Sequence, residues 1–288
     1  MLNYSIIIPH RNSLNLLKRA LLSVPEREDI EIIVIDNSTD IIDFSSLKKS
    51  LDFKLYFSDS NKGAGHARNV GLEAASGKWT LFLDADDFFT DNAFDYFDKY
   101  ITKSYEIVYF NCTSISEKTK KIANRHTYYS QLVEEFTRNT NSTEDFLRYK
   151  FYSASSKLIS SNLIKSNNIR FEEVVTSNDL LFSIKIGHFA KSITADMGLV
   201  YCITLNSGTL TTRKSKLDLR SRFKAGINQY HFMNEINRRD LRPYLMSKYI
   251  DSFRFGFSET LLFTGLILKN KINIFLGLSY WVKKIVRK

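Results

Sequence analysis

The chain has 288 residues, enough for one large domain or two small ones with a sizeable core. Its content of 43% hydrophobic and 25% charged residues excludes wholesale disorder. A formal charge of +10 favours acidic partners such as phosphorylated substrates, anionic lipid or nucleic acid. The two cysteines, Cys112 and Cys202, cannot form a disulfide framework, and both are expected to be buried thiols.

Strand and helix patterns alternate in the first part of the chain. Apolar runs predict strands at residues 4–9, 30–36, 53–57, 79–83 and 105–110. Helices are predicted after the cap residue Asn12, from 61–65 to Gly77, and near 91–103. This order predicts a right-handed, mostly parallel α/β sheet flanked by helices.

The middle and the end of the chain give weaker patterns. Residues 111–150 are polar and basic, which favours loops with one or two helices, and the structure of 158–169 stays open because it has no clean period. Helical spacing predicts a helix over 178–189, and apolar runs predict strands at 193–195 and 199–203. From about residue 217 the pattern is helical and strongly basic.

Three carboxylates, Asp84, Asp86 and Asp87, follow the predicted strand at 79–83. The carboxyl ends of strands are where open α/β sheets place their ligands. Carboxylates this close together repel one another unless solvent or a cation screens them. Their oxygens suit Mg²⁺ or Mn²⁺, the ions that accompany nucleotide diphosphates.

Two other interpretations of these acids need no diphosphate. The turn could be merely solvated, with Asp91 and Asn92 capping the helix that follows. A calcium loop is excluded, because Phe88 and Phe89 occupy places where such a loop needs a ligand and a turn glycine.

Acids or proline end several of the predicted parallel strands, so these residues should line one edge of the sheet. Pro9, Asp36 and the group Asp84–Asp87 are in such positions, and His10 and His66 face the same edge unless they are simply solvated. The pattern resembles the inverting family-2 glycosyltransferases, which have the GT-A nucleotide-diphosphosugar fold. The resemblance covers residues 1–215 and is carried by Ser5-Ile-Ile-Ile-Pro9, Ile33-Val-Ile-Asp36-Asn-Ser-Thr-Asp40, Asn61-Lys-Gly63, Ala67-Arg68-Asn69-Val-Gly71, Gly77, Phe82-Leu-Asp84-Ala-Asp86-Asp87 and Asn178-Asp179.

The resemblance implies a role for each matching residue. The residues that would bind the donor nucleotide are Pro9, Arg11, Asp36, Arg68, Asp84 and Asp86. Asp84 and Asp86 would bridge ribose and metal, and Asp86 with Asp87 would hold Mn²⁺ or Mg²⁺ on the departing diphosphate. Asp179 would be the general base that deprotonates the acceptor hydroxyl. Taken alone, Asp179 could be an ordinary acid of a helix's first turn, and Arg68 a surface residue.

This chain departs from the family pattern at two positions. It has Asp36-Asn37 where the family often has paired acids, which affects the base contact. It has Asn178 where the family often has Glu, which alters the charge beside Asp179. The Gln-x-x-Arg-Trp signature of processive members is absent, so one sugar per encounter is expected.

The resemblance also divides the chain. Residues 1–215 would form the GT-A domain, with a nucleotide-binding half at 1–110 and an acceptor half at 111–215, and 216–288 would be a basic helical extension. Between Leu261 and Lys288 there are six basic residues and no acids. On one helix face of this tail lie Phe275, Leu278, Val282 and Ile285. Such a helix suits an anionic membrane surface, or else it packs on the protein's own core.

The sequence has no signal peptide, and no apolar run approaches the ~20 residues of a spanning helix. The expected location is therefore the cytoplasm, either free or at the inner face of the cell membrane. The expected function is the metal-dependent, inverting transfer of one sugar from a nucleotide-sugar donor to a saccharide acceptor. The donor is expected to be a UDP-sugar. By resemblance, that acceptor would be linked to a polyprenyl diphosphate in bacterial O-antigen, capsule or lipooligosaccharide synthesis.

Two alternatives come from other classes of protein. Leu83-Asp84-Ala-Asp86 also resembles the nucleophile strand of haloacid-dehalogenase phosphatases, although in that class this strand usually comes first, whereas here other predicted strands precede it and Asp87 follows it. A non-catalytic protein that binds membrane or nucleic acid through its basic tail is the other alternative. Nucleic acid is disfavoured as a partner because the basic residues are not interleaved with a recognisable motif.

Overall fold

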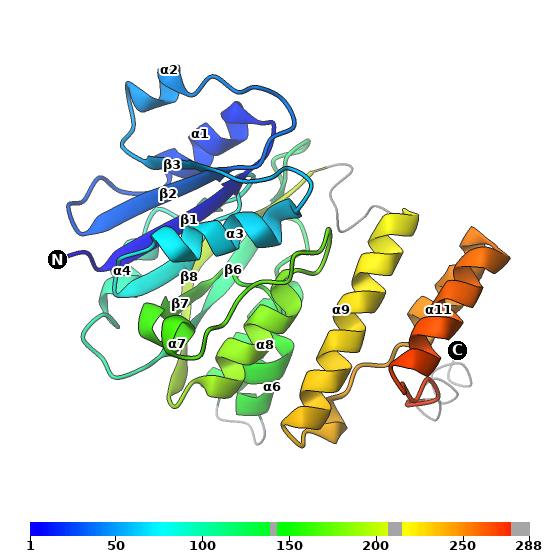
Figure 1. The fold of residues 1–288 in the computed structure, drawn as a ribbon. Helices are drawn as coiled ribbons and strands as arrows, with labels where there is room; N and C mark the ends of the chain where they lie inside the picture. Colours follow the sequence, from blue (N-terminus) through cyan, green and yellow to red (C-terminus); the bar gives the residue numbers. More distant parts are fainter. Residues whose placement is uncertain (139–142, 207–214, 278–288) are drawn as a thin grey trace. The chain divides into compact units, whose positions relative to one another are not determined.

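The computed structural model describes residues 1–138, 143–206 and 215–277 (Figure 1). The chain divides into two compact units. The larger unit comprises Met1–Val174 and Asn178–Thr209, and the smaller comprises Val175–Ser177 and Leu210–Lys288. The domain division predicted at residue 215 stays a prediction, because it adjoins residues 207–214, which lie outside the described part.

Within the described residues, the larger unit is built on an eight-stranded sheet with the order β3-β2-β1-β4-β7-β6-β8-β5. The strands are β1 (Tyr4–His10), β2 (Ile30–Asp36), β3 (Lys54–Phe57), β4 (Trp79–Phe82), β5 (Phe88–Phe89), β6 (Ile107–Ser116), β7 (Lys157–Ser160) and β8 (Ile193–Leu205). The first four are mutually parallel, as are β6 and β8. β7 is antiparallel to β4 and to β6, and β5 is antiparallel to β8, so the sheet is mixed.

The strand register brings several carboxyl ends to one edge of the sheet. In the paired strands, His10 lies opposite Asp36, and Asp36 lies opposite Phe57. β1 does not end at Pro9 but continues to His10. Proline has no backbone N–H to donate, but the strand tolerates Pro9 because the pairing between β1 and β4 ends at Ile7. At position 9 no donor towards β4 is therefore needed.

Helices cover both faces of the sheet (Figure 1). In the larger unit they are α1 (Leu14–Leu22), α2 (Ser45–Lys48), α3 (Gly63–Ala74), α4 (Ala93–Asp98), α5 (Thr127–Thr137), α6 (Thr143–Lys150), α7 (Ser161–Ser166) and α8 (Asp179–Phe189). Alternate residues of β1 enter different cores, as expected from the period of a strand. Ile6 and Ile8 belong to the core that includes residues of α1 and α4, whereas Ile7 belongs to the core that includes residues of α3, α7 and α8.

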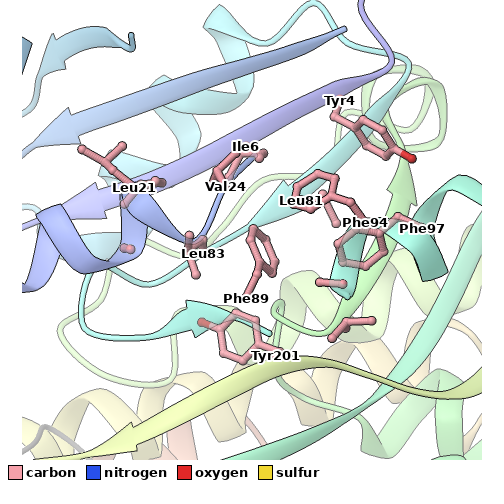
Figure 2. Close-up of a cluster of buried hydrophobic side chains, with 14 of the residues drawn as sticks. Tyr4, Ile6, Leu21, Val24, Leu81, Leu83, Phe89, Phe94, Phe97 and Tyr201 are labelled. Carbon is pink, nitrogen blue, oxygen red and sulfur yellow. The ribbon is translucent and has the colours of Figure 1, made fainter. Parts of the chain in front are cut away.

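The first of these cores is rich in aromatic side chains (Figure 2). Phe89 of β5 meets Phe94 and Phe97 of α4 edge to face, at ring distances of 5.6 and 5.7 Å. Tyr201 of β8 also contacts the Phe89 ring edge to face, at a ring distance of 6.0 Å. This packing fixes the short strand that follows the three acids, and the turn that carries them is therefore anchored on both sides.

Several sequence predictions differ from the structure where long-range pairing decides. The predicted strand at 105–110 begins at Ile107 and runs to Ser116, into residues expected to be loop. The two short strands predicted at 193–195 and 199–203 form the single strand β8. These two long strands pair with each other in parallel, and this tertiary pairing outweighs the polar composition of the second half of β6.

Local signals failed at some helix starts. The residue that immediately precedes α1 is Ser13 and not the predicted cap residue Asn12. Asn12 has a backbone φ of 56°, and its side chain donates a hydrogen bond to Thr39 Oγ1. α4 covers only six residues of the predicted helix at 91–103. The region left open by the sequence, 158–169, contains the end of β7 and all of α7.

The smaller unit is helical in its described residues, as the pattern from 217 predicts. Its elements are α9 (Lys216–Glu235), η1 (Arg239–Leu241), α10 (Met246–Ser252), η2 (Phe253–Phe255) and α11 (Phe257–Lys269). Phe223 and Phe263 centre its core, with ring centroids 4.3 Å apart. Phe275 lies beyond α11, and the rest of the predicted tail helix face, Leu278, Val282 and Ile285, lies outside the described residues. Among the described helices, none is both long and apolar enough to cross a bilayer.

Candidate active site

The three acids lie in the tight turn between β4 and β5. β4 is fully buried, and its end is fixed to β1 by a hydrogen bond from Leu83 N to Ile7 O of 3.1 Å. The turn closes with a bond of 2.9 Å from Asp87 N to Asp84 O. The acids therefore lie at the carboxyl end of β4, the position that the sequence predicts.

Asp87 is the buried member of the group, with 6% of its surface exposed. Both its carboxylate oxygens accept hydrogen bonds from β8. Oδ2 accepts from the Tyr201 hydroxyl at 2.8 Å, and Oδ1 accepts from Thr204 N at 2.7 Å. Burial, followed by the charges of Asp86 and Asp84, raises the pKa of Asp87 well above its ordinary value. Asp87 thus attaches the acidic turn to β8.

Asp86 is half-buried and more open to a ligand. Its Oδ2 accepts a long hydrogen bond of 3.3 Å from Asn206 Nδ2, and its backbone carbonyl accepts from Arg19. Burial and the neighbouring charge of Asp84 raise its pKa. Crowded carboxylates with raised proton affinity are the situation that a bound cation would relieve.

Arg68 of α3 connects this turn to the start of α8. Its Nη2 donates to Asp84 Oδ1 at 2.5 Å, and its Nη1 donates to Asn178 Oδ1 at 2.7 Å. The guanidinium also lies over the Phe171 ring, 5.4 Å from the centroid. The side chain is only 10% exposed, which excludes the interpretation of Arg68 as a surface residue.

Asp179 is the first residue of α8 and follows directly on Asn178. Its side chain is half-buried, and partial burial raises the pKa of its carboxyl group above the ordinary value. The charge of Arg68 opposes this rise, and that of Asp84 adds to it. A carboxylate with raised proton affinity and permanent cationic support has the character of a general base.

A second cluster lies at the carboxyl ends of β1 and β2. Ser13 N donates to His10 Nε2 at 3.1 Å, which leaves Nδ1–H to donate to Asp36 Oδ1 at 2.9 Å. Ser38 adds bonds from its hydroxyl and its backbone N–H to the same oxygen. His10 is 1% exposed, so the alternative of a solvated histidine is wrong for it.

The remaining predicted residues lie around these two clusters. Pro9 is half-buried in β1 next to His10, and Arg11 is exposed, with Nη1 donating to Ser60 O at 3.2 Å. His66 of α3 contacts Glu173 Oε1 through Nδ1 at 2.8 Å. Cys112 and Cys202 are buried free thiols, as predicted.

Several partners of the acids have no signal near them in the sequence. Tyr201 and Thr204 are 114 and 117 residues from Asp87, in a strand that is predicted only from its apolar composition. Asn178 and Arg68 are 110 residues apart. Only the order of the family motifs could have suggested that these segments meet.

The chemistry of the acidic turn fits a divalent cation. Asp84 and Asp86 offer hard oxygen ligands, as Mg²⁺ and Mn²⁺ prefer. Within the described residues no group of three or more His, Cys, Asp or Glu side chains is arranged so that it could hold a metal ion by itself. A cation here would therefore need further oxygens, of the kind that a diphosphate and water supply.

The mixed α/β sheet, with acids at strand ends along one edge and an acid at the start of α8, has the GT-A class of fold. Residues 5–166 match the model of the family described as glycosyl transferase family 2, and the chain therefore belongs to that family. The family and fold that the sequence predicts are thus confirmed. Membership of glycosyl transferase family 2 gives no support to the alternative of a haloacid-dehalogenase phosphatase.

Among curated relatives, a Campylobacter jejuni GalNAc(5)-diNAcBac-PP-undecaprenol beta-1,3-glucosyltransferase is 30% identical over 182 residues, which is 61% of this chain and 56% of the relative. The chain spans between 13% and 56% of the lengths of the curated relatives compared.

Solved structures show the same fold. Residues 1–349 of Staphylococcus aureus TarS in complex with UDP-GlcNAc align with a TM-score of 0.59 and 20% identity, over 79% of this chain and 67% of that one. A Pyrobaculum calidifontis mannosyltransferase, PcManGT, in complex with GDP-Man and Mn²⁺ aligns with a TM-score of 0.56 and 15% identity, over 92% and 80%. At these identities the likeness concerns the fold alone.

Proposed function

We propose that this protein transfers one sugar from a nucleoside-diphosphate donor to a saccharide hydroxyl, with inversion at the anomeric carbon. One observation carries the proposal. Arg68 bonds both Asp84, in the acidic turn, and Asn178, the residue preceding Asp179. Membership of glycosyl transferase family 2 supports the same reaction class.

Asp179 is the general base in this proposal. Its carboxylate accepts the proton of the acceptor hydroxyl as that oxygen forms a bond to the anomeric carbon. The bond between the anomeric carbon and the donor phosphate oxygen breaks on the opposite face, and the nucleoside diphosphate leaves with the electron pair. Burial makes Asp179 basic enough for this step, while Arg68 keeps it ionised beforehand.

Asp36 holds the base of the donor in this proposal, next to Pro9 and Arg11. All three of its hydrogen bonds from His10 and Ser38 converge on Oδ1. Oδ2 is therefore the oxygen with capacity to accept an N–H of a uracil ring. His10 fixes the orientation of that carboxylate from its buried position.

A divalent cation, Mn²⁺ or Mg²⁺, would be held at Asp86 and Asp84. When bound, it would neutralise the charge that develops on the leaving diphosphate. The sequence pairs Asp86 with Asp87 as ligands. We assign Asp87 instead to fixing the turn, because both its oxygens accept bonds from β8.

For the donor and acceptor we propose a UDP-sugar and a saccharide linked to a polyprenyl diphosphate. The UDP-GlcNAc in the TarS complex and the undecaprenol-linked substrate in the name of the Campylobacter relative support these classes. The reaction would then belong to bacterial surface-polysaccharide synthesis at the cytoplasmic face of the membrane.

The smaller unit supports an anionic membrane surface as a partner. Phe257, Leu261 and Leu268 of α11 are 83%, 60% and 72% exposed, at spacings that place them on one helix face. Lys269 and Lys271 follow on the same segment. Apolar residues beside cations suit the interface of a membrane with anionic lipids.

The function is tested by screening transfer from UDP-, GDP- and dTDP-sugars to lipid-linked saccharides with Mn²⁺. Chelation should abolish transfer, and Asp179→Asn should lower kcat about 10²–10⁴-fold, the usual contribution of a general base. Binding of UDP to that variant, measured by calorimetry, should be unchanged. Asp91→Asn, an exposed acid beyond the turn, is the matched control and should remain fully active. Full transfer by Asp179→Asn would refute the proposed base.

A further inference from the structure

Arg19 is a partly buried cation in the last turn of α1 that none of the steps above uses. Its side chain is 27% exposed, and its guanidinium lies over the Phe88 ring, 5.2 Å from the centroid. Nη1 donates to Glu117 Oε2 at 2.6 Å, whereas Nη2 donates to the backbone oxygen of Asp86 and, at 3.0 Å, to Thr204 Oγ1. One side chain thus joins α1, the acidic turn and β8.

The bond to Asp86 fixes one peptide unit of the acidic turn. The carbonyl of Asp86 and the N–H of Asp87 belong to the same planar peptide group. That N–H donates to Asp84 O at 2.9 Å, and the carbonyl accepts from Arg19, so the group is held at both ends. Because a planar group held at both ends cannot rotate freely, the directions of the Asp86 and Asp87 side chains are fixed relative to each other.

The same guanidinium nitrogen also supports the buried member of the turn. Thr204 accepts from Arg19 through its hydroxyl, while its backbone N–H donates to Asp87 Oδ1 at 2.7 Å. These contacts close a ring, which runs from Nη2 to the Asp86 carbonyl, along the chain to Asp87, and through Thr204 back to Nη2. Such a network resists displacement at any one bond, because each partner is held by the others.

Arg19 contacts the backbone of the turn and leaves its carboxylates available. Arg68, by contrast, donates to a carboxylate oxygen of Asp84. Arg19 donates instead to the Asp86 carbonyl, so it does not occupy the oxygens that a cation would need. Glu117 balances the guanidinium charge from 2.6 Å, which reduces the repulsion between Arg19 and a divalent cation in the turn.

We propose that Arg19 is a positioning residue that holds the acidic turn in the geometry that binds the divalent cation. The inference rests on the proposed function, since it takes Asp84 and Asp86 as ligands of that cation. In this role Arg19 acts through the peptide between residues 86 and 87 and contacts neither the cation nor the donor. Outer contacts of this kind orient metal ligands, and their loss lowers metal affinity about 10–100-fold.

The first test is the binding of Mn²⁺ to the full chain in the presence of UDP, measured by electron paramagnetic resonance for wild type and Arg19→Met. The variant should bind Mn²⁺ about 10–100-fold more weakly. If Arg19 were merely a cation near the site, its removal would lessen repulsion and strengthen Mn²⁺ binding. The two explanations therefore predict changes of opposite sign, and equal or tighter binding by Arg19→Met would overturn the inference.

Arg27→Met is the matched control. Arg27 has a similar exposure, 29%, and pairs with Asp29 at 2.8 Å. It lies over the ring of Tyr4 at the amino end of β1, whereas the acidic turn lies at the carboxyl ends of the strands. Loss of Arg27 should lower stability without changing the affinity for Mn²⁺. If Arg27→Met weakens Mn²⁺ binding as much as Arg19→Met does, the effect is not specific to Arg19 and the inference fails.

Arg19→Lys serves if Arg19→Met does not fold. Lysine keeps the charge, but its single ammonium nitrogen cannot reproduce the planar fork that reaches Glu117, Asp86 and Thr204 together. Binding of Mn²⁺ in the presence of UDP should therefore still weaken, by about threefold or more. Unchanged affinity in Arg19→Lys would show that the charge and not the fork is needed, which contradicts a positioning role.

The second test needs neither metal nor activity. Hydrogen exchange of the Asp87 N–H, which bonds Asp84 O, is followed by NMR in the metal-free full chain. Exchange should be about tenfold faster in the Arg19 variants than in wild type, because the peptide unit is then less well held. Equal exchange rates would reject the inference even if sugar transfer is established. If the wild-type protein binds no Mn²⁺, the cation site of the proposed function is rejected, and the exchange rates still decide whether Arg19 fixes the turn.

Discussion

Asp84, Asp86 and Asp87 are neighbours in the chain but have different surroundings. Asp84 is paired with Arg68, Asp86 is half-buried, and Asp87 is enclosed by donors from β8. Identical carboxyl groups within four positions can therefore serve different purposes. The difference comes from hydrogen-bond donors and burial, and not from residue type.

At the opposite edge of the sheet, Glu31 provides a prediction on pH. Its side chain is 4% exposed and accepts bonds of 2.6 Å from Ser5 Oγ, Lys54 Nζ and Ser76 N. Burial raises the pKa of Glu31, but these bonds outweigh it, so the pKa falls from 4.5 to about 2. The folded pKa lies below the unfolded one, so the stabilisation is present above about pH 4.5 and is lost as the pH falls towards 2.

The difference in unfolding free energy between wild type and Glu31→Gln should therefore be largest at pH 7. By pH 3 it should shrink by about 2 kcal/mol, as measured by urea denaturation. Glu26→Gln, at an exposed position, is the control and should show no such trend. If the difference in unfolding free energy between wild type and Glu31→Gln stays constant between pH 7 and pH 3, the pKa of Glu31 is not lowered in the folded protein.

Among the elements, α3 has the greatest influence on the candidate site. It lies across β1 and β2 (Figure 1), and three of its residues hold the segment that leads into α8. Asn69 exchanges hydrogen bonds of 2.8 and 3.0 Å with the backbone of Phe171, and Arg68 bonds Asn178. Gly65 permits close approach, since a Cβ there would lie 2.1 Å from Glu172 O and 3.0 Å from Asn178 Cβ.

We expect Gly65→Ala to displace the segment that positions Asp179. Overpacking should cost about 1–3 kcal/mol in chemical denaturation, and kcat/KM per folded molecule should fall about tenfold or more. Gly71→Ala is the matched control on the same helix. Its Cβ would meet side-chain atoms of Ile7 and Ile35 at 2.5 and 2.8 Å, in the core and away from Asp179. It should lower stability only, and equal losses of kcat/KM in both variants would contradict the role of Gly65.

At the scale of the whole molecule, the two units have separate cores. Aromatic and aliphatic clusters fill both faces of the sheet in the larger unit, whereas the smaller unit has its own core around Phe223 and Phe263. The proposed chemistry is confined to the larger unit. The exposed apolar face of α11 belongs to the smaller one, so a membrane role can be altered without touching Asp179.

We expect the protein to sediment with vesicles that contain anionic phosphatidylglycerol and not with neutral vesicles, and salt should weaken binding. Phe257→Ser combined with Leu261→Ser and Leu268→Ser should abolish it. Leu22→Ser with Ile41→Ser removes exposed apolar residues from the larger unit and serves as the control. If the wild-type protein does not bind anionic vesicles, or if the triple variant binds them normally, the exposed face of α11 is not a membrane-binding surface.

Much of the nucleotide-binding half could be predicted because its signals are local. Apolar runs set the first four strands, and the acids that follow them necessarily lie at one sheet edge. β6 and β8 were harder to delimit, since half of β6 is polar and becomes a strand only by pairing with β8. The cap at Ser13 was missed because Asn12 instead bonds a loop more than 20 residues away.

The sequence by itself determined the family, the order of strands and helices in the first half, and the positions of Asp84 and Asp179 at the end of a strand and the start of a helix. Periodicity and motif order encode these features, because they depend on neighbours in the chain. Only the tertiary structure decided that Arg68 joins Asp84 to Asn178, that Asp87 bonds β8 and that Lys157 is buried. Those partners are distant in sequence, and the packing of helices and strands against one another determines which donor or charge reaches each carboxylate.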